Sequence, residues 1–173
     1  MFDSDEVIAA SVDSLIATLS SPDGLTRQKA RIDLVRIGEP AVGALAAVLT
    51  GTPGVAHWEA AKALGQIASP SAAPALVDAL EDNEFSVRWL AAEALVAVGG
   101  QGLAALLHAL ADRPTSGLLR EGAHHVLHDL IAKRYLLESL ETAVKPVLAA
   151  LDGSEPAVTV PGAAEKALTR MGA

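Results

Sequence analysis

A motif of alanine, leucine and one further apolar residue recurs five times along the chain. In every copy an alanine stands four residues before the leucine, and an apolar residue stands three residues after it. The leucines are Leu34, Leu64, Leu95, Leu127 and Leu168, separated by 30, 31, 32 and 41 residues. Periods of roughly 30 to 45 residues are typical of stacked helical hairpins. The repeat therefore predicts the architecture before any single residue is considered.

Each motif fits the second helix of a hairpin, because its apolar residues recur at helical spacing. The second helices are expected around residues 27–38, 57–68, 88–99, 120–131 and 161–172. The first helices are expected around residues 5–19, 40–50, 71–81, 101–111 and 136–151. We therefore predict an all-α fold, a right-handed α-solenoid of about five hairpins in one domain over residues 1–173. The repeats are expected near residues 4–38, 39–68, 69–99, 100–132 and 133–173.

The repeat is irregular in two places. The turn around residues 114–117 is two residues longer than its equivalents. An insertion of about residues 133–142 precedes the last hairpin, and its leucines Leu136, Leu137 and Leu140 predict a lengthened helix. Elsewhere Gly and Pro mark the turns between helices, as at residues 51–54.

Composition limits the classes of function. Hydrophobic residues make up 51% of the chain and aromatic residues only 3%, which favours helices packed through small side chains. The formal net charge is −8, and no basic run is present, so nucleic acid is not an expected partner. The chain has no cysteine, which excludes disulfides, thiolate metal ligands and a cysteine nucleophile.

Targeting and catalytic signals are also missing from the sequence. The acidic start, MFDSDEV, lacks the basic and then apolar pattern of a signal peptide. No apolar run is expected to approach the roughly 18 residues of a membrane-spanning helix. Because the sequence also has no P-loop, nucleophile elbow or HExxH motif, we expect a cytoplasmic non-enzyme without a cofactor and without a membrane partner.

Two segments point to a known family. Residues 82–95, DNEFSVRWLAAEAL, and residues 60–67, AAKALGQI, resemble the HEAT-like repeats first noted in phycobilin lyase subunits. The resemblance implies the solenoid, and it implies that a turn acid pairs with an arginine of the second helix, as Asp82 could with Arg88 and Asp112 with Arg120. It also implies an alternative function, that of an accessory subunit of a bilin lyase-type enzyme. The architecture itself serves many unrelated uses.

A polar row occupies the position seven residues before the leucine. It consists of Arg27, His57, Arg88 and Arg120. These side chains could bind an acidic partner, or they could form a structural ladder to carboxylates in the turns. Since the position lies on the inward stripe of the helix, we favour the structural ladder.

The second helices are expected to present a mixed-charge face that binds a partner protein. Trp58 and Trp89 occupy the same position in adjacent repeats and are therefore expected to lie near one another. Each could pack between neighbouring hairpins, or it could be exposed as an anchor for a partner. The predicted partner-binding residues are Trp58, Glu59, Lys62, Trp89, Glu93 and His125. We predict a non-catalytic scaffold, monomeric or weakly self-associating, that binds another protein on the concave face of these helices.

Four of the five histidines lie close together in the sequence of the fourth repeat. His124 and His128 are one helical turn apart, a spacing able to hold a metal, and His108 or Asp129 could add a ligand. His125 is expected to point elsewhere. Polar packing is the simpler interpretation of this cluster, so no metal site is predicted, and a minor metal-binding role stays open as an alternative.

Overall fold

The computed structural model describes residues 4–51 and 54–173. These described residues form helices and connecting turns and contain no strand. The α-helices are α1 (Ser4–Thr18), α2 (Gly24–Ile37), α3 (Glu39–Leu49), α4 (Val55–Ile67), α5 (Ala73–Ala79), α6 (Phe85–Val98), α7 (Leu103–Asp112), α8 (Gly117–Ala132), α9 (Glu138–Leu151) and α10 (Pro156–Met171). Two short 3₁₀ helices, η1 (Pro70–Ala72) and η2 (Gly99–Gly102), precede α5 and α7. The predicted all-α fold is therefore confirmed.

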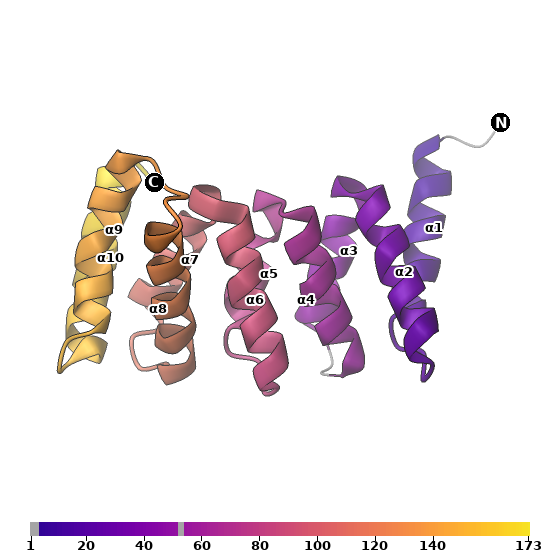
Figure 1. The fold of residues 1–173 in the computed structure, drawn as a ribbon, viewed down its shortest axis with the longest axis horizontal. Helices are drawn as coiled ribbons and strands as arrows, with labels where there is room; N and C mark the ends of the chain where they lie inside the picture. Colours follow the sequence, from indigo (N-terminus) through magenta and orange to yellow (C-terminus); the bar gives the residue numbers. More distant parts are fainter. Residues whose placement is uncertain (1–3, 52–53) are drawn as a thin grey trace.

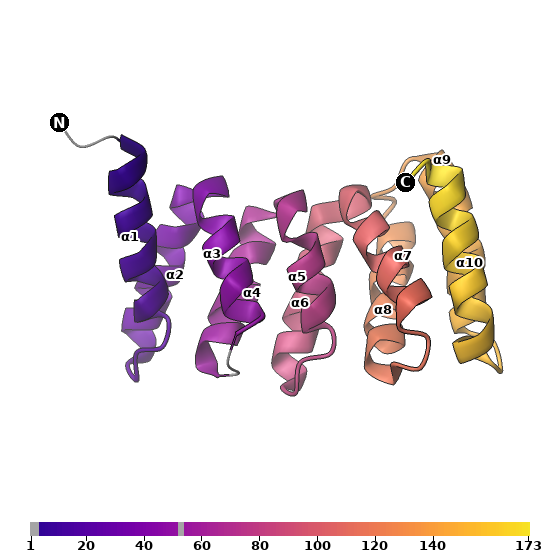
Figure 2. The ribbon, with the colours of Figure 1, turned by 180° about the vertical axis from the view of Figure 1, so that it is seen from behind.

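The helices stack in two rows to form the predicted α-solenoid. In Figure 1 the row of α2, α4, α6 and α8 lies in front, and Figure 2 shows α1, α3, α5 and α7 from the other side. The chain descends along each first helix at the back and rises along the second helix in front, so it winds in a right-handed sense (Figure 1). We call the surface of α2, α4, α6 and α8 the second-helix face.

The motif residues form the core that joins the two rows. All five motif alanines and all five motif leucines are buried, and they belong to one continuous cluster that extends from Val12 to Leu168. A small alanine at this position lets two helices approach closely, while the leucine fills the space between them. The burial confirms the register that the sequence motif predicted.

Four of the second helices are followed by a residue with positive φ four positions after the motif leucine: Gly38, Ala68, Gly99 and Gly172. Gly38 and Gly99 both have φ 73°, a region open mainly to glycine. Ala68 stands at the equivalent position with φ 54° and ψ 34°, which is left-handed for a residue with a Cβ. In the second repeat, Ala68 therefore has a conformational cost at the turn into the next helix. The repeats with glycine at this position do not have this cost.

The stretch Phe85–Asp112 is long and apolar enough to cross a membrane by length and composition alone. This corrects the expectation that no such stretch exists. In the structure it consists of α6, η2 and α7, and more than half of its most apolar window is buried between neighbouring helices. Burial in the solenoid accounts for its apolar character.

The insertion before the last hairpin differs from the prediction of a lengthened helix. Helix α8 ends at Ala132, and residues 133–137 form a turn in which Arg134 has φ 57°. A Cβ at Gly100 would lie 2.9 Å from Leu140 Cδ1 and 3.4 Å from Leu136 Cδ2, so both leucines cover η2. Leu137 is exposed. The turn residues Thr52 and Pro53, also predicted, lie outside the described residues.

The turn at residues 133–137 reverses the last hairpin. Helix α9 packs against α8 in the front row, and α10 packs against α7 in the back row (Figures 1 and 2). In the preceding hairpins the first helix lies at the back. The motif of residues 161–172 is thus helical, as predicted, but its charged residues Lys166 and Arg170 lie in the row opposite to the one expected.

Candidate partner-binding site

The six predicted partner-binding residues lie on three adjacent second helices. Trp58, Glu59 and Lys62 are on α4, Trp89 and Glu93 are on α6, and His125 is on α8. Trp89 is the most exposed of the two tryptophans, with 48% of its surface accessible, and Glu59 is buried at 4%. The structure therefore separates residues that a partner can reach from residues that hold the helices together.

Glu59 is the clearest correction to the predicted site. Its carboxylate lies between α2 and α4, 2.9 Å from Arg31 Nε and 3.4 Å from Arg27 Nε. Arg31, itself buried, also donates from Nη1 to Gln66 Oε1 at 2.8 Å. Two guanidinium groups thus draw this carboxylate into the helix interface, so Glu59 is not available to a partner.

Arg31 is a structural residue that the sequence interpretation missed. It occupies the position three residues before the motif leucine, where the next two repeats have the alanines Ala61 and Ala92. A long charged side chain in place of a small one requires a partner across the interface. That substitution is the signal that could have predicted the burial of Glu59.

Trp58 and Trp89 have different environments although they share a repeat position. Trp58 is half-buried against the core, and Lys62 Nζ lies 4.5 Å from the centre of its ring. Trp89 instead packs on the His125 ring, with the centroids 4.7 Å apart and the planes at 39°. The expected neighbour of Trp89 was Trp58, whereas the structure pairs Trp89 with a residue of α8.

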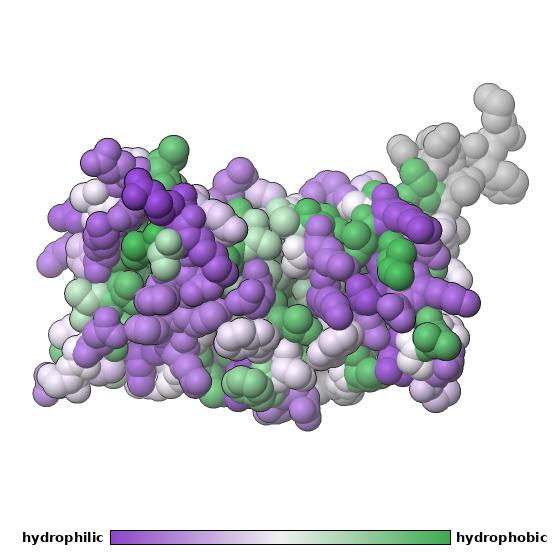
Figure 3. All heavy atoms as spheres, in the orientation of Figure 1, coloured by the Kyte–Doolittle hydropathy of each residue, from purple (hydrophilic) through white to green (hydrophobic). Residues whose placement is uncertain are grey.

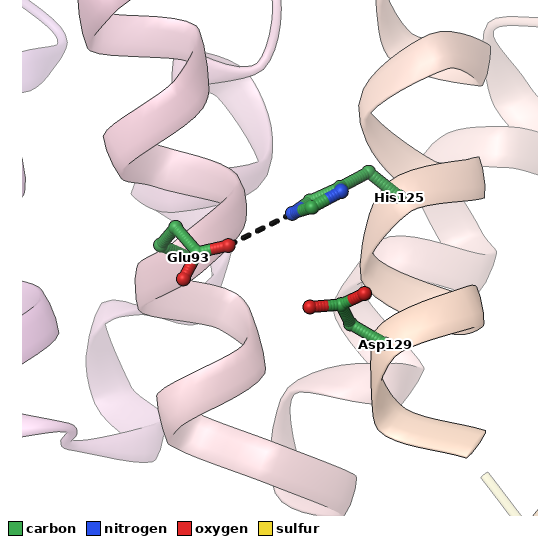
Figure 4. A group of neighbouring side chains, drawn as sticks. All are labelled: Glu93, His125 and Asp129. Carbon is green, nitrogen blue, oxygen red and sulfur yellow. Dashed lines mark hydrogen bonds and ion pairs between the residues drawn. The ribbon is translucent and has the colours of Figure 1, made fainter. Parts of the chain in front are cut away.

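His125 joins α6 to α8. Its Nε2 lies 2.8 Å from Glu93 Oε1, and Figure 4 shows the imidazole reaching from α8 toward Glu93, with Asp129 beside it. Lys133 Nζ lies 2.7 Å from Asp129 Oδ2. This hydrogen bond lowers the pKa of Asp129 below its ordinary value, and the same carboxylate raises the pKa of Lys133. The four side chains form a polar bridge across the helix interface.

The same cluster has the side chains that a divalent metal would need. One ligand atom each from Glu93, His125 and Asp129 lies within 4.8 Å of the other two. His125 therefore takes part in the most metal-like group, contrary to the expectation that it points elsewhere. His124, which was considered as a metal ligand with His128, has its Nε2 2.9 Å from Asp152 Oδ1. A metal at this group would compete with Lys133 for Asp129, because a carboxylate that binds an ammonium is a poorer ligand.

The polar row is structural, as predicted, but its arginines donate to backbone carbonyls of the turns and not to the turn carboxylates that the sequence indicated. Arg88 Nη1 donates to the backbone carbonyls of Asp82 and Asn83 at 2.9 and 3.2 Å. The Asp82 carboxylate does not pair with Arg88, as the resemblance implied, because its Oδ2 lies 2.7 Å from His57 Nδ1 of the preceding repeat and its Oδ1 accepts from the backbone N–H of Glu84. The arginines thus fix their own turns, and the His57 contact ties two repeats together.

A pocket of about 420 Å³ opens between α6 and α8 beside Trp89. Its walls include Phe85, Trp89 and Leu118, and the fully buried Leu80 lies at its base. His124, His125 and His128 line it from α8. Trp89 and His125 were predicted for the site, whereas Phe85 and Leu118 were missed because both lie outside the repeated motif.

Exposed apolar residues also mark the first turn of each second helix. Leu25, Val55, Phe85 and Leu118 are the first or second residues of α2, α4, α6 and α8, and each is at least 39% exposed. We call these four residues the apolar edge. Figure 3 shows hydrophobic patches between hydrophilic ones on this side of the molecule, including along its lower border. Such regularly spaced exposed side chains are suited to contact with another protein.

The chain is similar to known repeat proteins. Residues 43–128 match the family model described as HEAT repeats. No curated protein matches the sequence. Three engineered proteins with crystal structures from the Northeast Structural Genomics Consortium are similar at 23%, 21% and 20% identity, with TM-scores of 0.43, 0.44 and 0.45. The matches cover 92%, 92% and 96% of this chain and 78%, 80% and 49% of those chains.

Proposed function

Because the chain is a HEAT-repeat protein, with the family's repeats matched over residues 43–128, we propose that it is a non-catalytic scaffold that binds a partner protein on its second-helix face. HEAT repeats are in general protein-interaction modules, since stacked hairpins display equivalent positions at regular intervals. The observation that carries the proposal is the pocket between α6 and α8, with exposed Phe85 and Trp89 in its wall. The bilin lyase alternative rests on the sequence resemblance alone.

The charged residues of this face support binding more than catalysis. Glu93 pairs with His125, Asp129 pairs with Lys133, and Glu59 pairs with Arg31. A catalytic acid or base has to exchange its proton with a substrate. Each of these three carboxylates is instead held by another side chain of the protein. Within the described residues, their common effect is to hold neighbouring helices or turns in place.

Aromatic side chains make Trp89 the centre of the proposed contact. A partly exposed tryptophan beside an apolar pocket contributes much of the binding energy in many interfaces. Trp58 is half-buried and covered on one side by Lys62, so its contribution is expected to be smaller. The proposed contact residues therefore no longer include Glu59. They are Trp89, Glu93, His125, Lys62, the accessible part of Trp58, and the newly added Phe85 and Leu118.

Site-specific photo-crosslinking tests this proposal. A benzoyl-phenylalanine at position 85 is expected to capture a partner from lysate of the native host, and Trp89→Ala in the same chain is expected to reduce the yield about tenfold or more. The matched control places the crosslinker at the exposed His108 on α7, on the opposite side of the array. Equal capture from positions 85 and 108, with an unchanged circular dichroism spectrum, would reject the second-helix face as the binding surface.

A further inference from the structure

The pocket between α6 and α8 exists because these two helices are held apart. At the preceding interface, Gly65 of α4 lies against Ala94 of α6, where a Cβ on Gly65 would be 3.1 Å from the Ala94 Cβ. The equivalent pair between α6 and α8 is Val96 and Val126, and both are buried. Two valines in place of glycine and alanine widen the interface, so a hollow opens at the surface end of these helices.

The hollow is mainly apolar at its base and in its walls. Leu80 forms the base, and Phe85, Trp89 and Leu118 form the walls. A volume of about 420 Å³ is sufficient for one large side chain of a partner and part of its backbone. The occupant that these walls favour is a leucine or phenylalanine, because burying such a side chain removes a large apolar surface from water.

The pocket lining has one acidic and one basic side chain, Glu121 and Arg88, and further carboxylates lie around it. Glu121 lines it and is exposed, and it makes no ion pair within residues 4–51 and 54–173. Arg88, the only lysine or arginine that lines the pocket, donates to two backbone carbonyls of its own turn. The surrounding acids are Glu93, Asp129 and Asp152, which pair with His125, Lys133 and His124. With neutral histidines, these four acids outnumber Arg88 and Lys133 by two charges, and the whole chain carries −8.

We propose that the pocket between α6 and α8 binds a partner segment in which a leucine or phenylalanine is flanked by lysine or arginine. The apolar side chain enters the hollow over Leu80, and a basic residue beside it pairs with Glu121. The face of Phe85 can hold a cation, as the Arg88 guanidinium 5.5 Å from its ring centre shows. This inference rests on the proposed function and specifies the chemistry of the partner.

Peptide titration monitored by tryptophan fluorescence tests the inference. In Trp58→Phe protein, Trp89 is the sole tryptophan and reports the pocket directly. The probes are the peptides Lys-Lys-Leu-Phe-Lys-Lys, Glu-Glu-Leu-Phe-Glu-Glu and Lys-Lys-Ala-Ala-Lys-Lys. The first is expected to cause a saturable change in Trp89 emission, and the other two are expected to bind at least tenfold more weakly. Equal affinity for the first two peptides would overturn the charge preference.

A carboxylate variant and its matched control test the role of Glu121. Glu121→Gln is expected to weaken the basic peptide about two- to fivefold, the range of an accessible ion pair. Glu165→Gln makes the same charge change at an exposed position of α10 and is expected to leave the affinity unchanged. Equal effects of the two variants would show that only the net charge of the chain matters, which would overturn the specific pairing.

The two proposals fail in distinguishable ways. If position 85 still captures a partner in a Trp89-dependent manner but no basic peptide binds, the inference is wrong and the scaffold function stands. If the basic peptide binds but no partner is captured through the second-helix face, the pocket has the proposed chemistry and the scaffold proposal is wrong. If neither result is obtained, both proposals are rejected.

Discussion

Arg31 and Glu59 form a buried ion pair between α2 and α4, with Arg31 Nε 2.9 Å from Glu59 Oε2 and both side chains at most 7% exposed. Glu59→Leu would leave the charges of Arg31 and Arg27 without their carboxylate in the interface. We expect this change to lower the free energy of unfolding by about 3–5 kcal/mol, because an uncompensated charge in a protein interior is costly. Urea denaturation measures the change.

The exposed pair of Asp33 and Arg36 is the control for Glu59. Its carboxylate and guanidinium are 3.0 Å apart, but the side chains are 48% and 76% exposed. Asp33→Ala is therefore expected to have no measurable effect on stability, since solvent screens such pairs. A loss from Asp33→Ala as large as that from Glu59→Leu would show that burial is not what makes the Glu59 pair important.

Ala68→Gly is expected to stabilise the protein by roughly 0.5–1 kcal/mol. The left-handed conformation at Ala68 costs about 1–2 kcal/mol for a residue with a Cβ, and glycine removes this cost. Part of the resulting gain in stability is offset by the greater flexibility of glycine in the unfolded chain. Gly99→Ala at the equivalent position makes the opposite change and is expected to destabilise by roughly 1–3 kcal/mol. A lower melting temperature for Ala68→Gly would contradict the role assigned to this turn.

Ala91→Leu is expected to destabilise the protein by about 1–3 kcal/mol through overpacking. Ala91 is fully buried where α6 meets its neighbours. Ala97 lies on the same helix but is exposed, so Ala97→Leu adds the same side chain without a clash and serves as the control. Thermal denaturation of the two variants compares them, and equal melting temperatures would mean that the register of α6 is wrong.

The ion pair of Asp129 and Lys133 predicts a pH-dependent contribution to stability. Because the pKa of Asp129 is lowered in the folded state, the pair stabilises the protein above the ordinary aspartate pKa of about 3.9. The contribution is lost as pH falls through the lowered value. Because the pKa of Lys133 is raised, the contribution is also lost as pH rises above the ordinary lysine pKa of about 10.4 and through the raised value.

Lys133→Met tests this linkage. The pKa of Asp129, followed by NMR titration of its carboxyl carbon, is expected to rise toward the ordinary value because the hydrogen bond from Lys133 is its largest cause of lowering. At pH 7 the wild type is expected to be more stable than the variant. Near pH 2 this difference in the free energy of unfolding is expected to disappear. An unchanged pKa of Asp129 would show that His128 or another group determines it.

The regular part of the fold could be predicted because its determinants are local. The spacing of Ala91 and Leu95 on one helix fixes which face is buried, and the same spacing recurs in each repeat. The reversal of the last hairpin could not be predicted in this way. The motif with Leu168 specifies an apolar helix face, but the row in which that helix lies depends on the turn at residues 133–137.

The candidate site was predictable to a similar extent. Trp89, Glu93 and His125 were selected from their repeat positions, and the structure brings them into contact across α6 and α8. Glu59 occupies the same repeat position as other face residues, yet it is buried because Arg31 lies on the neighbouring helix. The only sequence signal of this pairing, between residues 28 positions apart, is the arginine at position 31 where the next two repeats have alanine.

The reversed last hairpin changes how this chain can be engineered. A combinatorial library that varies the same motif positions in every repeat would place four sets of variable residues on one side of the protein and the fifth, on α10, on the other side. To extend a designed binding surface across all five hairpins, the fifth set of substitutions has to be taken from α9 (Glu138–Leu151), whose sequence does not carry the motif.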